Sequence, residues 1–294
     1  MQLFVNDLTV MDFSYLCPQR GIVGESWIVD IVLDGALNEQ SMVLDFGKVK
    51  KQIKAIIDDS VDHKLLVPTE HEYTAVKHNH DDTSQWVDFA RPEGRSIHLY
   101  CPADAFAFIE AETITMQAVI DYLRAVIKRE LPQNVEGLQL SLRTEQIDGF
   151  YYHYTHGLKK HDGNCQRIAH GHRSKITIAL DNIRQPVLEK LWSNQWQDIY
   201  LGSRDDVVSV PELNRSEAAK QLTREATHVG YSYVAEQGLF ELIVPKAENY
   251  LLETDSTVEC IAEYLAQQIH QRHPKQKVMV RAFEGVGKGA IAYA

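Results

Sequence analysis

The 294-residue sequence predicts an α+β protein that contains two consecutive copies of one domain. Three observations support this prediction. A long pattern occurs twice, several runs alternate apolar and polar residues as strands do, and other segments carry apolar residues at helical spacing. Each copy is expected to pack two helices onto one face of a four-stranded antiparallel sheet. The copies are expected to span residues 1–147 and 148–294, each close to the usual domain size.

The repeat is clearest in residues 96–123 and 239–265, which read SIHLYCPADAFAFIEAETITMQAVIDYL and LFELIVPKAENYLLETDSTVECIAEYL. Both contain an alternating run, a proline, a turn-rich stretch and a helical pattern that ends in an acidic residue followed by Tyr-Leu. A second alternating run follows in each copy and ends on Glu145 or Glu284. The beginnings of the copies match more weakly, and residues 183–238 interrupt the repeat.

The individual elements follow from periodicity. Strands are predicted where apolar and polar residues alternate, as in SWIVDIVLDG (26–35) and KITIALD (175–181). Residues 44–60 predict a helix with Asp45 as its N-cap. Two further helices are predicted in residues 115–130 and 257–269. The apolar stripes that we assign to the core are Val49, Ile53, Ile56 and Ile57; Met116, Val119, Leu123, Val126 and Ile127; and Val258, Ile261, Leu265 and Ile269.

Composition narrows the class of protein. Hydrophobic residues make up 44% and charged residues 24%, which is typical of a soluble globular protein. The formal net charge of -11 argues against a nucleic-acid partner, although a local basic pocket can still hold a small anion. No apolar run approaches the roughly 20 residues of a membrane span. We expect a cytoplasmic protein without a signal peptide, whose four scattered cysteines are reduced thiols.

The stretch NCQRIAHGHRSKITIAL (164–180) carries the clearest chemical pattern. His170 and His172 project from the same face of the predicted strand, because strand side chains alternate. With His156 on the neighbouring predicted strand they form three ligands of a zinc site that leaves a fourth position open. The alternative is a pair of surface histidines on an edge strand. His153 and His161 are also close and could be ligands or surface residues, and we interpret both as surface residues.

The segments YTHGL and NCQRIAHGH resemble the zinc segment of the 6-pyruvoyl-tetrahydropterin synthase and 6-carboxy-tetrahydropterin synthase family. This resemblance implies that each copy is a tunnelling-fold (T-fold) domain. It implies that His156, His170 and His172 bind zinc and that Cys165 is the catalytic thiol. In the first copy, MVLDFGKVKKQIKAIIDDSVDHKLL (42–66) resembles a second family signature, in which Asp62 and His63 fall on a catalytic Asp-His pair.

The two copies depart from the family pattern in opposite ways. The first copy has Cys17, Val23 and Glu25 where the resemblance places the three zinc ligands, so we expect no zinc there. The second copy shows no matching Asp-His pair. Because the family forms rings with active sites between subunits, the resemblance implies a homo-oligomer. In such a shared active site, the second copy would supply the zinc ligands and Cys165. The first copy would supply Asp62 and His63 across an interface. The alternative is that both copies are inactive.

The resemblance also implies a substrate and its contacts. Glu284, which we prefer over Glu145, would bind a pterin ring through hydrogen bonds. Thr257 and Glu259 match a family helix start, although a helix cap with an early-turn acid explains them equally well. The predicted function is that of a zinc-dependent lyase that converts 7,8-dihydroneopterin triphosphate to 6-carboxy-5,6,7,8-tetrahydropterin, with release of acetaldehyde and triphosphate, for queuosine synthesis. The alternatives are 6-pyruvoyl-tetrahydropterin synthase activity, a non-catalytic pterin-binding protein, or a structural zinc protein with Cys165 as fourth ligand.

Overall fold

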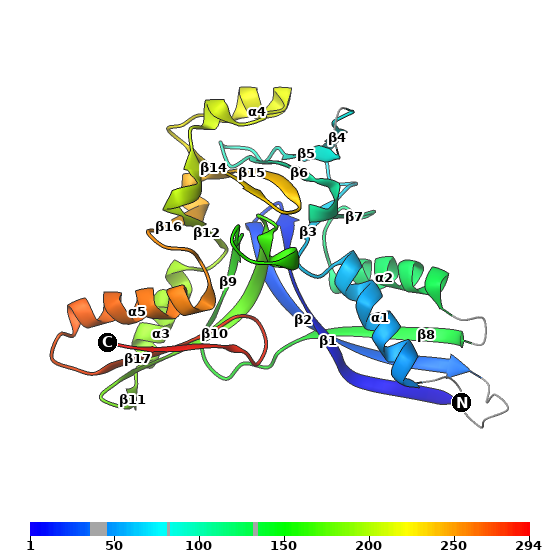
Figure 1. Cartoon of the computed structure of the whole chain (residues 1–294), viewed down its shortest axis with the longest axis horizontal. Helices are drawn as coiled ribbons and strands as arrows, with labels where there is room; N and C mark the ends of the chain where they lie inside the picture. Colours follow the sequence, from blue (N-terminus) through cyan, green and yellow to red (C-terminus); the bar gives the residue numbers. More distant parts are fainter. Residues whose placement is uncertain (36–45, 81–82, 132–134) are drawn as a thin grey trace.

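The structure is a computed structural model that describes residues 1–35, 46–80, 83–131 and 135–294. Figure 1 shows two sheets with helices at opposite ends of the molecule and a third sheet that lies above both. Asp45, the predicted helix cap, lies outside the described residues. Within the described ranges, no helix has the length and apolar character that crossing a membrane requires.

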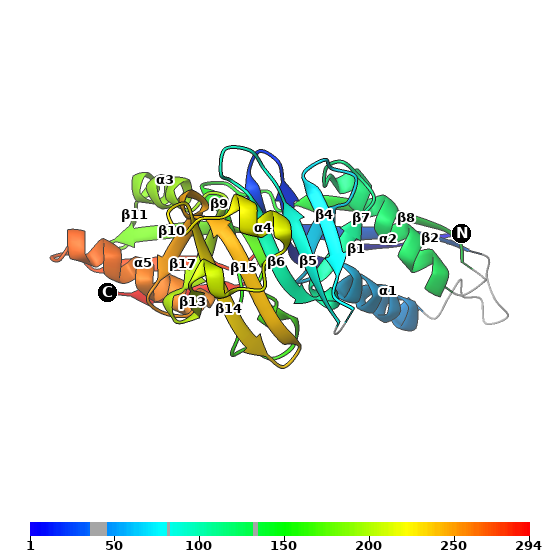
Figure 2. The same cartoon turned by 90° about the horizontal axis from the view of Figure 1, so that it is seen from above.

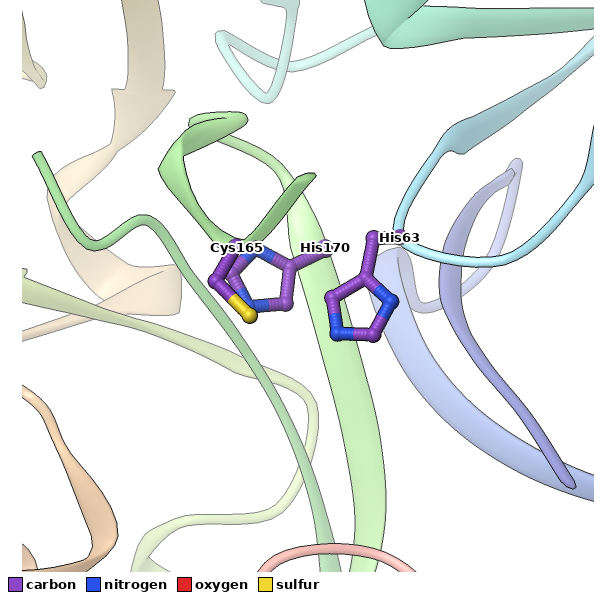
Figure 3. Close-up of side chains that lie close together, drawn as sticks. All are labelled: His63, Cys165 and His170. Carbon is purple, nitrogen blue, oxygen red and sulfur yellow. The ribbon is translucent and has the colours of Figure 1, made fainter. Parts of the chain in front are cut away.

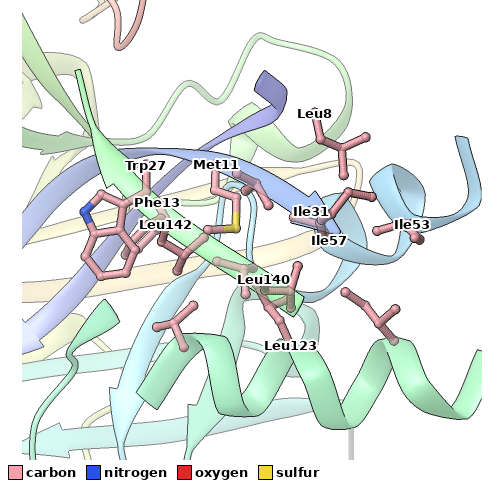
Figure 4. Packing of buried hydrophobic residues seen from close by; sticks show 14 of the residues in the cluster. Leu8, Met11, Phe13, Trp27, Ile31, Ile53, Ile57, Leu123, Leu140 and Leu142 are labelled. Atoms are coloured by element: carbon pink, nitrogen blue, oxygen red, sulfur yellow. The ribbon is translucent and has the colours of Figure 1, made fainter. Parts of the chain in front are cut away.

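The N-terminal sheet has five strands in the order β7-β3-β1-β2-β8. Its strands are β1 (Gln2–Cys17), β2 (Gly21–Gly35), β3 (Leu65–Pro68), β7 (Phe106–Ile109) and β8 (Val135–Thr144). The helices α1 (Phe46–Ser60) and α2 (Met116–Glu130) pack their apolar faces onto it. Figure 4 shows this core, in which Phe13 and Trp27 of the sheet lie in one cluster with Ile53 and Leu123 of the helices.

The C-terminal sheet has the order β16-β12-β9-β10-β17-β18, and the short β11 also pairs with β10. Its strands are β9 (Tyr151–His156), β10 (His170–Leu180), β11 (Ile183–Arg184), β12 (Ile199–Ser203), β16 (Asn249–Leu252), β17 (Val278–Phe283) and β18 (Gly289–Tyr293). The helices α3 (Pro186–Gln195) and α5 (Val258–Arg272) contribute to a second core around Trp192, Trp196 and Leu265.

A third sheet joins the two halves, with strand order β13-β14-β15-β6-β5-β4. Its strands are β4 (Thr74–His78), β5 (Ser84–Phe89), β6 (Ile97–Pro102), β13 (Val207–Val208), β14 (His228–Ala235) and β15 (Gly238–Pro245). Antiparallel pairing of β6 with β15 makes one continuous sheet from both halves, which crosses the middle of the molecule in Figure 2. The short helix α4 (Glu217–Leu222) lies beside it. The remaining elements are the 3-10 turns η1 (Ala103–Ala105), η2 (Gly163–Gln166), η3 (Arg204–Asp206), η4 (Val210–Glu212) and η5 (Lys246–Glu248).

The α+β class and the three predicted helices are confirmed. The prediction of a four-stranded antiparallel sheet in each half is wrong. β3 pairs with β1 and β7 in parallel, and β12 pairs with β9 and β16 in parallel. These parallel partners are far apart in the chain and are joined through other elements, since a tight turn can join only antiparallel strands. The sequence patterns of the short β3 and β12 did not reveal this.

The order of elements supports a duplication, which stays a prediction, as do the boundaries 1–147 and 148–294. Each half begins with a long hairpin, continues through a helix to a short parallel strand, and then contributes a hairpin to the third sheet. A 3-10 turn, another short strand, a long helix and a final strand follow in both halves. Residues 183–238, where the repeat is not visible in the sequence, contain α3, β12 and β14. These elements hold the same places as α1, β3 and β5.

The two long hairpins cross in close contact at Gly24 and Gly171. A Cβ atom at Gly24 would overlap the carbonyl oxygen of Tyr154, and one at Gly171 would lie 2.7 Å from the Cα of Gly24. Beside this crossing, the buried hydroxyls of Ser14 and Thr155 lie 2.7 Å apart. Glycine at both positions therefore permits backbone of one half to touch backbone of the other.

We expect Gly24→Ala to lower the free energy of unfolding by about 1–3 kcal/mol or more, because the added methyl meets rigid backbone rather than a movable side chain. Denaturant unfolding measures the change. Gly137→Ala is the matched control, since its Cβ would meet only the Asp34 side chain, and alanine is at least as favourable as glycine in a strand. Equal stability of the Gly24→Ala variant and the wild type would contradict the importance of the crossing.

Candidate metal centre and active site

Three buried histidines converge at the hairpin of β9 and β10. His156 ends β9 and pairs with His170 at the start of β10, so the strand register places these residues side by side. His172 lies two residues further along and projects from the same face. The three rings are 0–1% exposed, and one nitrogen of each lies within 4.8 Å of the others. This geometry can place three nitrogens around one metal ion, as the alternation in the sequence predicts.

The orientation of each ring fits a metal site. Nδ1 of His156 lies 2.9 Å from the carbonyl oxygen of Ser256, and Nδ1 of His170 lies 2.9 Å from that of Arg167. A carbonyl only accepts hydrogen bonds, so both Nδ1 atoms carry the proton and leave the Nε2 lone pair free. Nδ1 of His172 lies 3.2 Å from Oδ1 of Asp12. Protein acceptors on the outer nitrogens are typical of metal-binding histidines.

The inner nitrogens need a partner. Nε2 of His156 and Nε2 of His172 are buried and have no hydrogen-bond partner among the described residues, and Nδ1 of His172 has only the ion-pair contact with Asp12. A buried polar atom without a partner costs free energy unless an ion or a water satisfies it. Burial, followed by the effect of the neighbouring histidines, lowers the pKa of His156 and of His170 well below the ordinary value. Both are therefore neutral, which is the form that binds zinc.

A second group of side chains lies beside the three histidines. Cys165, in the turn η2, lies with His63 and His170 so that their ligand atoms are within 4.8 Å of one another. Figure 3 shows His63 approaching from the N-terminal half, while Cys165 and His170 come from the C-terminal half. The His63 and His170 ring centroids are 5.1 Å apart. The predicted combination of an Asp-His pair from one half with a thiol from the other thus occurs within a single chain.

The position of His63 is held by Asp62 and by strand β1. Nδ1 of His63 lies 2.6 Å from Oδ2 of Asp62, and the His63 N–H donates to the Asp12 carbonyl at 2.7 Å. Its backbone has φ +57°, a left-handed conformation that costs about 1–2 kcal/mol in a residue other than glycine. Burial lowers the pKa of His63, but hydrogen bonds with Asp62 and Cys165 and their charges outweigh it and raise the pKa to about 10.

Among the predicted substrate residues, Glu284 lies beside this centre. Its Oε1 is 3.9 Å from Nε2 of His172, and its Oε2 is 3.5 Å from Nζ of Lys288. Thr257 caps helix α5 by accepting a hydrogen bond from the N–H of Cys260 at 3.3 Å. Glu259 is an exposed residue in the first turn of that helix. The geometry of Thr257 and Glu259 is that of a helix start.

Glu145, the alternative to Glu284, contacts basic residues of strand β10. Its Oε1 lies 2.6 Å from Nζ of Lys175, and its carbonyl accepts from Arg173 at 2.9 Å.

Sequence reasoning missed Asp12, which faces both His172 and the Asp62-His63 pair. Burial raises the pKa of Asp12, but the facing His172, followed by Lys288 and Ser26, outweighs burial and lowers it to about 2. Nothing in the local sequence around Asp12 points to a metal site. Its role depends on the crossing of two hairpins that are far apart in the chain.

Strand pairing corrects one predicted counterpart in the N-terminal half. Tyr15 pairs with Val23 in the way that His156 pairs with His170, so Tyr15 and not Cys17 takes the position of His156. Cys17 lies two residues further on, where it pairs with Gly21 at the end of the hairpin. The shorter connection between β1 and β2 makes the two segments hard to align by eye. Val23 offers no ligand atom, so the expectation of no zinc site in the first half is kept as a prediction.

The prediction that His153 is a surface residue is wrong, whereas His161 is exposed as predicted. Nδ1 of the buried His153 lies 2.7 Å from the carbonyl of Gly24 and 3.3 Å from Oε1 of Glu25. His153 is buried because it lies where the two hairpins cross, a contact that no local pattern reveals.

Ion pairs surround the second junction between the halves, where Tyr15 and Val23 stand at the positions that His156 and His170 hold in the first. Asp198 takes the place of His63, with φ +59° and an N–H that donates to the His153 carbonyl at 2.8 Å. Arg20 binds Asp198 through two nitrogens at 2.6 and 2.8 Å and also donates to the Tyr15 hydroxyl at 3.2 Å. One junction between the halves gathers imidazoles and a thiol, whereas the other gathers paired opposite charges.

The fold and the site together define an α+β protein with a candidate three-histidine metal centre beside a thiol and an Asp-His pair. Residues 17–142 match the family model of 6-pyruvoyl tetrahydropterin synthase. No curated protein sequence matched the chain.

Solved structures that resemble the chain include two parasite enzymes. The 6-pyruvoyl tetrahydropterin synthase of Plasmodium falciparum is 10% identical, with 48% of this chain and 90% of that chain covered and a TM-score of 0.38. The corresponding enzyme of Plasmodium vivax is 12% identical, with 49% and 97% covered and a TM-score of 0.38.

We expect the purified protein to bind one divalent ion per chain, because only one of the two equivalent positions carries three histidines. Elemental analysis after equilibration with Zn²⁺ measures the stoichiometry. His170→Ala should remove the bound ion, while His161→Ala, at an exposed position outside the cluster, should retain it. Two equivalents of metal per chain, or retention of the ion by the His170→Ala variant, would contradict this assignment.

Glu25, which lies at this second junction, predicts that the free energy of unfolding depends on pH. Burial, opposed by Arg173 and a backbone hydrogen bond, raises the pKa of Glu25 to about 7 from an ordinary 4.5. The folded state therefore holds a proton that the unfolded chain releases, and this contribution is complete below pH 4.5 and lost as the pH rises through 7.

Glu25→Gln removes this contribution. We expect the variant to gain stability relative to the wild type as the pH rises from 4.5 to 7, by at most about 1.4 kcal/mol per pH unit. Denaturant unfolding at several pH values measures the difference. A difference that stays constant over this range would show that Glu25 titrates normally.

Proposed function

We propose that the chain is a zinc-dependent carbon–carbon lyase of the tetrahydropterin synthase family. Its substrate would be 7,8-dihydroneopterin triphosphate, and its products 6-carboxy-5,6,7,8-tetrahydropterin, acetaldehyde and triphosphate. The observation that carries the proposal is the placement of three inward-facing imidazoles beside a thiol and an Asp-His pair. Members of the matched family are lyases that act on pterins. The carboxy product and its use in queuosine synthesis rest on the sequence resemblance alone.

The residues that would hold the zinc ion are His156, His170 and His172, through Nε2 in each case. A bound zinc ion supplies Lewis acidity, which makes the carbon next to a coordinated hydroxyl easier to deprotonate. Three imidazoles suit zinc and would leave a coordination position for the substrate. The carbonyl acceptors on the outer nitrogens of His156 and His170 hold these two rings in the required orientation.

Cys165 and His63 would handle the protons. With its pKa raised to about 10, His63 is protonated at neutral pH and places a positive charge beside the Cys165 sulfur. Cys165 would be the base that takes a proton from the substrate side chain. His63, oriented by Asp62, can then return a proton to the product. The two steps would act at different atoms of the substrate side chain, and the short distance between Cys165 and His63 supports action on one bound substrate.

Glu284 would bind the pterin ring by accepting hydrogen bonds from its amino and ring N–H groups. Its carboxylate lies beside His172, so a ring held there would extend its side chain toward the histidines. We assign Thr257 and Glu259 to the start of helix α5 rather than to substrate binding. A homo-oligomer also remains part of the proposal, because outer strands such as β8 and β18 end their sheets and offer unpaired edges to a second copy.

Incubation of the zinc-loaded protein with 7,8-dihydroneopterin triphosphate should release acetaldehyde and 6-carboxytetrahydropterin, detected by a coupled reductase and by mass spectrometry. Cys165→Ala and His63→Ala should each lower kcat by about 10²–10⁴, because each removes a proton-transfer group. Cys17→Ala is the control, since its half-buried thiol pairs outside the cluster. A pyruvoyl product would reassign the reaction within the family. Binding of pterin without turnover would identify a non-catalytic protein.

A further inference from the structure

Asp12 lies between the metal centre and the Asp62-His63 pair. It belongs to β1 in the N-terminal half, yet its carboxylate faces β10 of the C-terminal half. Oδ1 lies 3.2 Å from Nδ1 of His172 and also accepts a hydrogen bond from the Ser26 hydroxyl. Oδ2 lies 3.6 Å from Nζ of Lys288. With only 4% of its surface exposed, Asp12 has its carboxylate committed to these partners.

The backbone of Asp12 holds the proton-handling pair. Its N–H donates to Oδ1 of Asp62 at 2.8 Å, while its carbonyl accepts from the N–H of His63 at 2.7 Å. The left-handed backbone of His63 is therefore tied to β1 by one hydrogen bond, and its orienting carboxylate by another. A shift of Asp12 along β1 would move both members of the pair.

His172 differs from the other two histidines in the acceptor on its outer nitrogen. His156 and His170 face neutral carbonyl groups, whereas His172 faces a carboxylate. A carboxylate on the outer nitrogen fixes the tautomer, orients the ring and makes the inner nitrogen a stronger donor to a metal. Ser26 keeps this carboxylate in place, because its hydroxyl also accepts from the N–H of Arg173 at 3.1 Å.

We propose that Asp12 is a positioning residue that orients His172 for metal binding through its carboxylate and orients Asp62 and His63 through its backbone. A single residue thereby sets the relative placement of groups that come from the two halves of the chain. The inference rests on the metal centre of the proposed function, but it does not depend on which pterin is the substrate.

His153 occupies the position in the C-terminal half that Asp12 occupies in the N-terminal half. Comparing their contacts shows which ones belong to the shared fold and which one involves a candidate metal ligand. The His153 carbonyl accepts from Asp198 as the Asp12 carbonyl accepts from His63. Its side chain faces Glu25, 3.3 Å away, as Asp12 faces His172. Both halves thus contain the same junction, but only the junction at Asp12 contacts a candidate metal ligand.

Asp12→Asn tests the proposal with the smallest change, since asparagine keeps the shape and the backbone contacts but removes the charge. The dissociation constant for Zn²⁺, measured by competition with a chelator, is expected to rise by about 10–100-fold. The ligand-field absorption of the Co²⁺-loaded protein should change in position or intensity, which a purely structural defect elsewhere would not cause. Both measurements are independent of turnover.

The control is His153→Asn, at the same junction in the other half. It should lower the unfolding midpoint, yet leave the Zn²⁺ dissociation constant within about twofold of the wild-type value. If Asp12→Asn does not fold, Ser26→Ala removes the hydrogen bond that orients the carboxylate, and a several-fold weaker binding of Zn²⁺ is expected.

Three results would overturn the proposal: wild-type protein that binds no Zn²⁺, unchanged affinity in both the Asp12→Asn and Ser26→Ala variants, or an equal loss of affinity in His153→Asn. Tight Zn²⁺ binding that depends on Asp12 in a protein that releases no acetaldehyde would refute the proposed lyase function while leaving the role of Asp12 intact.

Discussion

The contact between Gly24 and Gly171 is the constraint on which the candidate site depends. Two long hairpins from different halves cross there with no side chain between their backbones. The hydroxyls of Ser14 and Thr155 meet beside the crossing, and their 2.7 Å contact satisfies both polar groups in a buried position. Because the hairpins are this close, Asp12 of one half reaches His172 of the other. A larger separation would leave a metal centre without its proton-handling partners.

The crossing also explains how two similar halves can form two different centres. At one junction a carboxylate on β1 faces an imidazole on β10, and at the other an imidazole on β9 faces a carboxylate on β2. The architecture requires complementary groups at the junction, but it does not fix which half contributes the acid. In the first arrangement the imidazole, His172, has a free nitrogen that faces two other histidines. In the second arrangement the acid, Glu25, lies among ion pairs. The same fold therefore forms a cluster of paired charges there instead of a group of histidines.

The parts of this structure that sequence reasoning could predict are the local ones. The alternation of His170 and His172, and the helical stripes such as that of Ile53 and Ile57, follow from the period of a strand or a helix. The third sheet could not be predicted, because β6 and β15 pair across a long stretch of sequence and their patterns permit many partners. Asp12 and His153 were missed for the same reason, since each acts through a contact between the two halves.

The left-handed backbone at His63 and Asp198 shows which property the two halves share. Both residues follow a helix, adopt a conformation that is unfavourable for side-chain-bearing residues, and donate their N–H to the first strand of their own half. Since the side-chain hydrogen bonds of Asp198 within the described residues are with Arg20 and Gln197 and not with the candidate metal ligands, the strained turn belongs to the fold and does not depend on the metal site. The fold thus presents one side chain toward the other half at each of two places. The chemistry at each place depends on the residue there: an imidazole beside Cys165, or a carboxylate neutralised by Arg20.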